Sequence, residues 1–234
     1  VLGASATSSG SFLTPMMLGV VAGAAISGQA LSRLGGHYQR QGIAGFAVMG
    51  LGMFLISLMT ADTSYALAVL FIVIMGFGLG ITFPTFTIAV QNAVPHHLLG
   101  AVTASTQFYR SIGGAIGLAM LGSLMAKRFA SELSENLSNE MKQILPEELF
   151  SDLSNNPQVL VNSEALILFQ DGLRQTGNLD LSRQIVQTLR EALATAIGDI
   201  FLVSVIVLVV ALAVTIFLKE IPLRGREYYS ESEP

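Results

Sequence analysis

Five apolar stretches, each long enough to cross a lipid bilayer, constrain this chain more than any other feature. A helix needs about 20 apolar residues to cross about 30 Å of hydrocarbon. Five together, the first four separated only by short polar turns, predict an all-α polytopic membrane protein rather than buried helices of a soluble domain. Only 12% of the 234 residues are charged, against roughly 25% in an ordinary globular chain. The stretches occupy about residues 11–30, 43–59, 65–90, 100–126 and 197–218.

The region between the fourth and fifth stretches differs in kind, because most of the charged residues fall within 127–196. Apolar residues recur every four positions at both of its ends, which predicts amphipathic helices, the second continuing into the last stretch. We expect a helical extramembrane loop that packs as an outer cap or lies along the membrane surface. A ligand-binding domain is an open alternative. The periodic residues are Phe129, Leu133, Leu137 and Met141, then Leu181, Ile185, Leu189 and Leu193.

Basic residues in the short connections predict the orientation. The first loop carries Arg33 and Arg40 without an acid, and the tail 219–234 opens with basic residues. Because cytoplasmic loops are enriched in Lys and Arg, these segments are expected inside and the loop 127–196 outside. Lys127 and Arg128 oppose this assignment.

Residues 1–10 carry no charge and no initiator Met, so we expect a chain truncated at its N-terminus.

Small residues recur at helical spacing in three of the stretches. Such stripes let neighbouring backbones approach closely, so they predict tight helix packing. Pro84 follows the second stripe and is expected to kink its helix. A bend there that moves during transport is compatible with the packing role. The residues are Gly19, Gly23 and Ser27, then Gly76 and Gly80, then Gly113 and Gly117.

Arg110 lies in the otherwise uncharged run "STQFYRSIGGAIGLAMLG", about 15 Å into the membrane at about 1.5 Å per residue. Thr103, Gln107, Gly114 and Gly117 share its helix face. A charge at this depth marks a functional site by default, so the face is expected to meet protein or water. Two roles stay open: an anchor that pairs with carbonyls or an acid, or a group that lines a substrate cavity.

Several classes of function are excluded. The chain has no Cys and no clustered His and carboxylates, so no metal or cofactor site is predicted. No Ser-His pair or paired carboxylate lies within the spans, which argues against a membrane enzyme. The net charge of −4 gives no reason to expect nucleic acid.

Two stretches resemble a known family. The segment "SGQALSRLGGHYQR" resembles the cytoplasmic loop signature of the major facilitator superfamily, with Ser32 where that signature has an acid. The segment "GFGLGITFPTFTIAVQNAVPHHLLGAVTASTQFYRSIGGAIGLAMLG" resembles the fourteen-helix drug/proton antiporter branch of that superfamily. The matching positions are Gly28, Arg33, Gly35 and Arg40 in the loop, then Pro84, Gln91, Asn92, Ala93, Gly100, Phe108, Arg110, Gly113, Gly114 and Gly117.

This resemblance implies five helices of a C-terminal half, from a multi-pass exporter of amphiphilic compounds in a bacterial inner or plasma membrane. It implies proton antiport by alternating access, with the lipid bilayer, protons, the substrate and the remaining helices of the parent as partners. No acid lies deep in the spans, so the proton-carrying group is expected elsewhere. The alternative is a non-transporting scaffold or sensor whose outer loop binds a partner. The expected cavity-lining residues are Arg110, Gln107, Thr103, Phe83, Phe86, Gln91 and Asn92. The expected conformational residues are Pro84, Gly76, Gly80, Gly113, Gly114 and Gly117.

Overall fold

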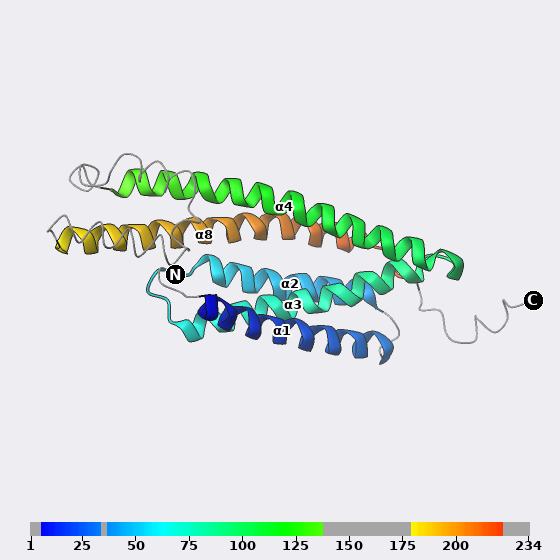
Figure 1. Ribbon diagram of the computed structural model, residues 1–234. Coiled ribbons are helices and arrows are strands. Elements are labelled where there is room, and N and C mark those ends of the chain that lie inside the picture. Colours follow the sequence, from blue (N-terminus) through cyan, green and yellow to red (C-terminus); the bar gives the residue numbers. More distant parts are fainter. Residues whose placement is uncertain (1–5, 34–36, 138–178, 222–234) are drawn as a thin grey trace, which may run out of the picture.

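The computed structural model describes residues 6–33, 37–137 and 179–221, and these residues form long helices that run up and down beside one another (Figure 1). Five of the helices are long and apolar enough to cross a membrane. The chain is therefore an all-α polytopic membrane protein, as predicted. The helices are α1 (Ala6–Arg33), α2 (Tyr38–Ser57), α3 (Tyr65–Asn92), the short 3-10 helix η1 (His96–Leu98), α4 (Leu99–Asn136) and α8 (Leu179–Ile216).

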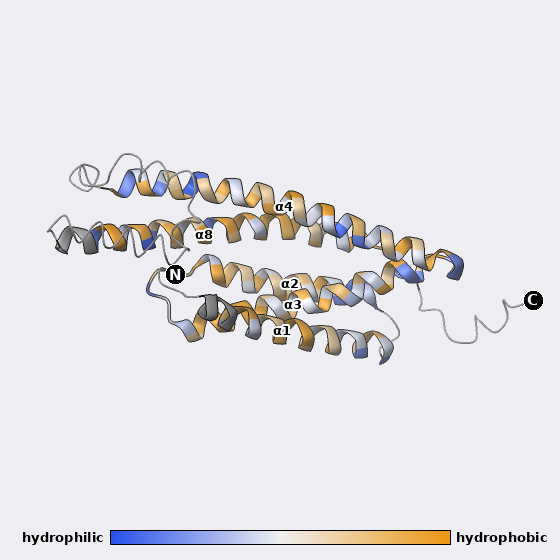
Figure 2. Ribbon diagram, viewed as in Figure 1, coloured by the Kyte–Doolittle hydropathy of each residue, from blue (hydrophilic) through white to orange (hydrophobic). Residues whose placement is uncertain are grey.

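The helices extend past the apolar stretches that predict them. α4 and α8 have 38 residues each, or about 57 Å at 1.5 Å per residue, which is nearly twice the hydrocarbon thickness. Hydropathy marks the part of a helix that lies in lipid, whereas the backbone continues as a helix into polar surroundings. Figure 2 shows hydrophobic residues along the bundle and hydrophilic residues at helix ends and turns, with a further hydrophilic stretch partway along α4.

Glycines allow α3 to pack closely between α1 and α2. A Cβ added to Gly23 would lie 2.2 Å from the carbonyl oxygen of Phe77, and one added to Gly80 would lie 2.1 Å from that of Val20. On the side facing α2, a Cβ added to Gly78 would lie 2.2 Å from the Met49 amide nitrogen. No side chain fits at these crossings, so the small residues there serve backbone contact.

Buried hydroxyl groups join α1 to α3 beside the proline of α3. Ser27, which is 1% exposed, donates to the carbonyl oxygen of Ile81 at 3.1 Å and lies 3.1 Å from the Thr85 hydroxyl. Thr85 also donates to the Ile81 carbonyl at 2.6 Å. Each buried hydroxyl thus has a partner next to Pro84, where the helix lacks one backbone donor.

Tyr38 holds the segment after α8 at the end of the bundle where α3 ends. Its hydroxyl donates to the Lys219 carbonyl at 2.9 Å and accepts a hydrogen bond from the Ile221 amide. The Asn92 side chain donates to the Ile221 carbonyl at 3.0 Å. The Tyr38 ring is 2% exposed and packs with Leu31 and Ala89. The first residue of α2 therefore ties three helix ends together.

Replacing Tyr38 with phenylalanine removes both hydrogen bonds of the hydroxyl and keeps the ring. We expect the full-length protein to lose about 1–1.5 kcal/mol of stability, seen as a lower unfolding midpoint in detergent. Tyr109→Phe is the matched control, because Tyr109 is 72% exposed and is expected to leave the midpoint unchanged. Equal midpoints for the two variants would mean that the hydroxyl contributes nothing.

The far ends of α4 and α8 pack on each other as an antiparallel pair. Phe129, Leu133, Ile185 and Leu189 are each 1% exposed or less and belong to one apolar cluster. The four-residue spacing that predicts amphipathic helices is thus the contact face of this pair, and α8 runs unbroken from it into the last apolar stretch. Met141 and the centre of the loop lie outside the described residues.

Candidate functional site

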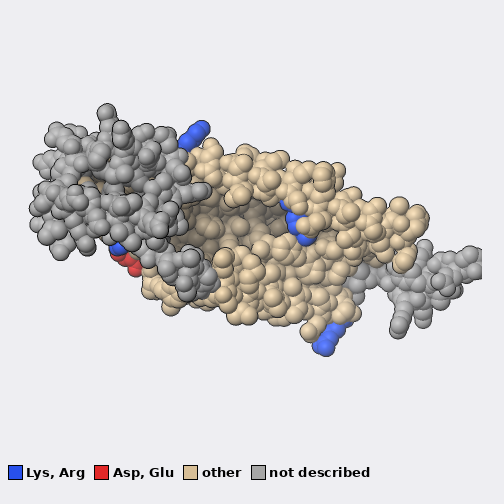
Figure 3. Space-filling view, in the orientation of Figure 1, with Lys and Arg blue, Asp and Glu red and all other residues tan. Residues whose placement is uncertain are grey.

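A hollow lies between α4 and the packed group of α1, α2 and α3 (Figure 3). Over residues 99–128, α4 has no buried side chain within the described structure. It packs on α8 at the far end, through the cluster around Phe129. The middle of α4 therefore stands apart from α1–α3 and borders the hollow.

Arg110 reaches across from α4 to α3. Its guanidinium carbon lies 4.6 Å from the centre of the Phe83 ring, which is cation–π contact. Its Nη1 lies 3.4 Å from the Gln107 side-chain oxygen, one helical turn away. Within the described structure no acidic side chain forms an ion pair with Arg110; the pair present is that of Arg128 with Asp199. Among the described residues, the guanidinium thus has an aromatic and an amide neighbour but no counter-charge.

Other predicted cavity residues lie nearby or elsewhere. The Gln91 side chain donates to the Thr103 hydroxyl at 3.0 Å, which joins the end of α3 to the start of α4. Phe86 packs on Phe46 of α2, with ring centres 5.3 Å apart. Asn92 binds the segment after α8, as described above. The structure therefore brings Arg110, Gln107 and Phe83 together. The Gln91–Thr103 pair lies nearer the end of α3 and the start of α4, and Phe86 packs against α2.

The glycines of α4 differ from those of α1 and α3. A Cβ added to Gly113, Gly114 or Gly117 would meet no atom within 4 Å. Gly76, by contrast, would place a Cβ 2.6 Å from the Met16 carbonyl oxygen. The glycine stripe on α4 therefore contacts no other helix within the described structure, whereas the stripes on α1 and α3 contact the backbone of a neighbouring helix.

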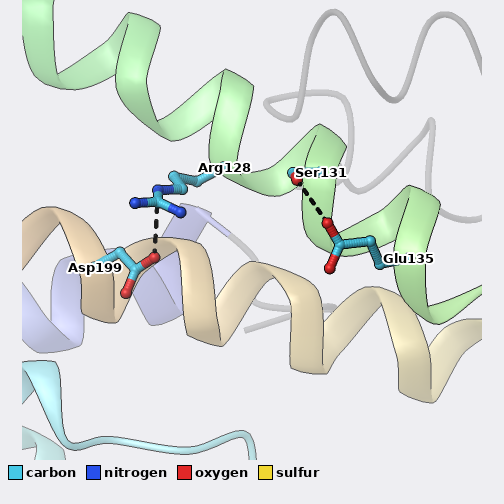
Figure 4. Close-up of polar contacts among 4 residues, drawn as sticks. All are labelled: Arg128, Ser131, Glu135 and Asp199. Carbon is cyan, nitrogen blue, oxygen red and sulfur yellow. Dashed lines mark hydrogen bonds and ion pairs between the residues drawn. The ribbon is translucent and has the colours of Figure 1, made fainter.

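An ion pair joins α4 and α8 near the apolar cluster (Figure 4). Arg128 Nε lies 3.6 Å from Asp199 Oδ2, with side chains 56% and 36% exposed. One turn further along α4, Ser131 donates to Glu135 at 3.2 Å. Exposed pairs of this kind contribute about 0–1 kcal/mol. Asp199 therefore has a structural partner at the helix surface and lies away from Arg110.

Comparison with known proteins identifies the family. The profile of the Major Facilitator Superfamily matches residues 1–118, half of the chain. The chain belongs to the Major Facilitator Superfamily. This confirms the resemblance read from the loop and from the segment around Arg110.

Several relatives carry names that refer to drug transport or resistance. The multidrug transporter protein MdtP of Bacillus subtilis is 32% identical over 239 residues, covering 100% of this chain and 43% of its own length. Multidrug resistance protein 3 of the same organism is 27% identical over 93% of this chain and 40% of its own length. A tetracycline resistance determinant of Streptomyces rimosus is 26% identical over 94% of this chain and 64% of its own length. No solved structure matches. The chain thus spans about two fifths of the length of the first two relatives.

The loop signature of this superfamily member lies at the junction of α1 and α2. Arg33 ends α1 and Arg40 lies in the first turn of α2, both exposed, while Gly35 lies outside the described residues. A Cβ on Gly28 would meet nothing within 4 Å. Ser32, at the position of the acid, donates to the Gln29 carbonyl at 2.9 Å. A hydroxyl bound to its own helix thus stands where the signature has a charge.

Neither Tyr38 nor the hydroxyl pair of Ser27 and Thr85 was predicted from the sequence. Tyr38 stands in the basic loop segment, and only its partners after α8 reveal its role. The four-residue spacing of Ser27 from Gly23 was read as packing, and it gave no sign of a hydrogen bond to α3. The His96–His97 pair is exposed in η1, and the described residues hold no group of three potential metal ligands.

Proposed function

We propose that the full-length protein is a secondary active exporter of amphiphilic small molecules, driven by proton antiport through alternating access. The observation that carries this proposal is the hollow beside α4, where a guanidinium with no ion pair in the described structure meets an aromatic ring inside a group of membrane-spanning helices. Membership of a transporter family and the drug-related names of its relatives support it. We place the protein in a bacterial cell membrane, as two relatives from Bacillus suggest.

The chain supplies a binding surface but no proton carrier at depth. Arginine cannot release a proton at neutral pH, and no Asp, Glu, Lys or His lies deep within the five spans. Asp199 is engaged by Arg128. We therefore assign proton coupling to an acidic group elsewhere in the full-length protein, and substrate contact to Arg110, Gln107 and Phe83.

Close packing indicates which helices move together. α1, α2 and α3 meet through backbone at Gly23, Gly78 and Gly80, so they are expected to move as one body. α4 contacts α3 near its own start, through Thr103, and at Arg110. The contacts to α3 are therefore expected to change between the two states of the transporter, with Pro84 as the adjustable point of α3.

Flux measured in proteoliposomes tests the proposal. The purified full-length protein is reconstituted, and uptake of ethidium, an organic cation, and pyrenebutyrate, an organic anion, is followed under an imposed pH gradient. The proposal expects movement of at least one probe, which a protonophore abolishes. Movement of neither probe, with protein correctly inserted, would favour a scaffold or sensor and contradict the proposal.

A further inference from the structure

The charge around Arg110 constrains what the hollow can bind. The guanidinium is exposed, and no acidic residue of the described structure pairs with it. The Asp199 carboxylate is held by Arg128, whose side chain lies five helical turns further along α4. A cation without a counter-charge is costly in surroundings of low dielectric constant. As the described residues charge it, the hollow therefore favours a negatively charged group beside Arg110.

The contact with Phe83 removes a site that a cationic ligand would use. An aromatic face attracts a cation through its ring quadrupole, but the Phe83 face already holds the guanidinium carbon at 4.6 Å. A positively charged ligand would lose this face and meet a like charge beside it. The aromatic contact thus orients Arg110 and works against organic cations.

Donors remain on Arg110 for a ligand. A guanidinium carries five N–H donors in a planar fork, and the structure gives it one long contact, at 3.4 Å, to the Gln107 oxygen. A carboxylate or sulfonate can accept two of these donors together, which is the strong form of the interaction. Gly114 and Gly117 lie on the same helix face, and a Cβ added to either would meet nothing within 4 Å in the described structure, so an apolar body has space beside the charged group.

Resting on the function proposed above, we infer that this site selects amphiphilic anions, whose acidic group binds Arg110 and whose apolar body lies along the open face of α4. Arg110 is then the residue that determines which substrate charge the site accepts. This narrows the substrate class from amphiphilic compounds in general to organic acids.

Three ligands with the same apolar body test the inference. Pyrenebutyrate, pyrenebutanamide and pyrenebutyl-trimethylammonium carry charges of −1, 0 and +1. Their affinities for the purified full-length protein in nanodiscs are measured by equilibrium dialysis, with empty nanodiscs subtracted. We expect the carboxylate to bind about tenfold or more tightly than the amide, the scale of a charge-assisted hydrogen bond, and the ammonium to bind most weakly.

Substitutions test whether the preference for the carboxylate arises from Arg110. Arg110→Gln is expected to equalise the carboxylate and the amide, whereas Arg110→Lys keeps the sign of the preference at reduced size, because an ammonium lacks the planar fork. Arg128→Gln is the matched control on the same helix, and it is expected to keep the full preference. Size-exclusion profiles confirm that each variant is folded.

Two results would overturn the inference. One is equal or tighter binding of the ammonium by the wild-type protein, which would mean that an acid from elsewhere in the chain neutralises Arg110. The other is a carboxylate preference that survives Arg110→Gln. Failure of the proposed function gives a different result. If the protein binds the carboxylate selectively but transports neither probe, then the proposed export is wrong and the inference stands. If the protein transports ethidium but does not prefer the carboxylate, then the inference is wrong and the proposed export stands.

Discussion

Replacing Arg110 with alanine in the full-length protein is expected to remove most of its export activity while leaving the amount of protein in the membrane unchanged. The side chain is exposed, and its described contacts are the Phe83 ring and one long hydrogen bond to Gln107. Its removal therefore costs the fold little. The loss of a charge-assisted contact to the substrate is expected to lower transport by about tenfold to a hundredfold. The measurement is flux per transporter, with membrane levels determined by immunoblot.

Arg128→Ala is the matched control, since it removes the same side chain from the same helix. Its ion pair with Asp199 is exposed, so flux is expected to stay near the wild-type value. Wild-type flux in Arg110→Ala at normal membrane levels would reduce Arg110 to a packing residue. A fall in membrane level equal to the fall in flux would show an anchoring role instead.

Replacing Gly23 with alanine is expected to disrupt the contact of α1 with α3. The new Cβ would lie 2.2 Å from the Phe77 carbonyl oxygen, and backbone atoms form both sides of the contact, so no side-chain rotation relieves the overlap. Overpacking commonly costs about 1–3 kcal/mol, and occasionally more; we expect about 3 kcal/mol or more here. The measurements are the membrane level and the unfolding midpoint in detergent of the full-length protein.

Gly28→Ala is the control on the same helix, because its added Cβ would meet nothing within 4 Å. Alanine is the better helix former by about 0.5–1 kcal/mol, so this variant is expected to equal or exceed the wild-type midpoint. If Gly23→Ala matches Gly28→Ala, then α1 and α3 do not cross as closely as described.

Composition and hydropathy predict the solvent and the helices, because a span of bilayer length must be predominantly apolar. The ends of the helices depend on other forces. α4 continues to Asn136 because Phe129 and Leu133 pack on α8 outside the apolar stretch. The hydropathy of α4 alone does not reveal that α8 is its packing partner.

Spacing along one helix shows which residues share a face but not what that face meets. Gly80 and Gly117 belong to similar stripes, yet the first meets the backbone of Val20 and the second meets open space. Phe83 and Phe86 are three residues apart, yet one lies under Arg110 and the other lies against Phe46. Such differences arise from tertiary packing, as does the role of Tyr38, whose partners lie more than 180 residues further along the chain.

Cysteine labelling tests most directly whether the face of Arg110 meets the hollow rather than lipid. The 234 residues contain no Cys, so single cysteines can be placed cleanly, in a full-length background without others. Gln107 contacts Arg110, whereas Phe108 lies on the opposite side of α4 and is 62% exposed. We predict that Gln107→Cys reacts with a charged, water-soluble thiol reagent, and that Phe108→Cys reacts only with a lipid-soluble maleimide. The reverse pattern, with Gln107→Cys labelled from the lipid and closed to the water-soluble reagent, would contradict the account.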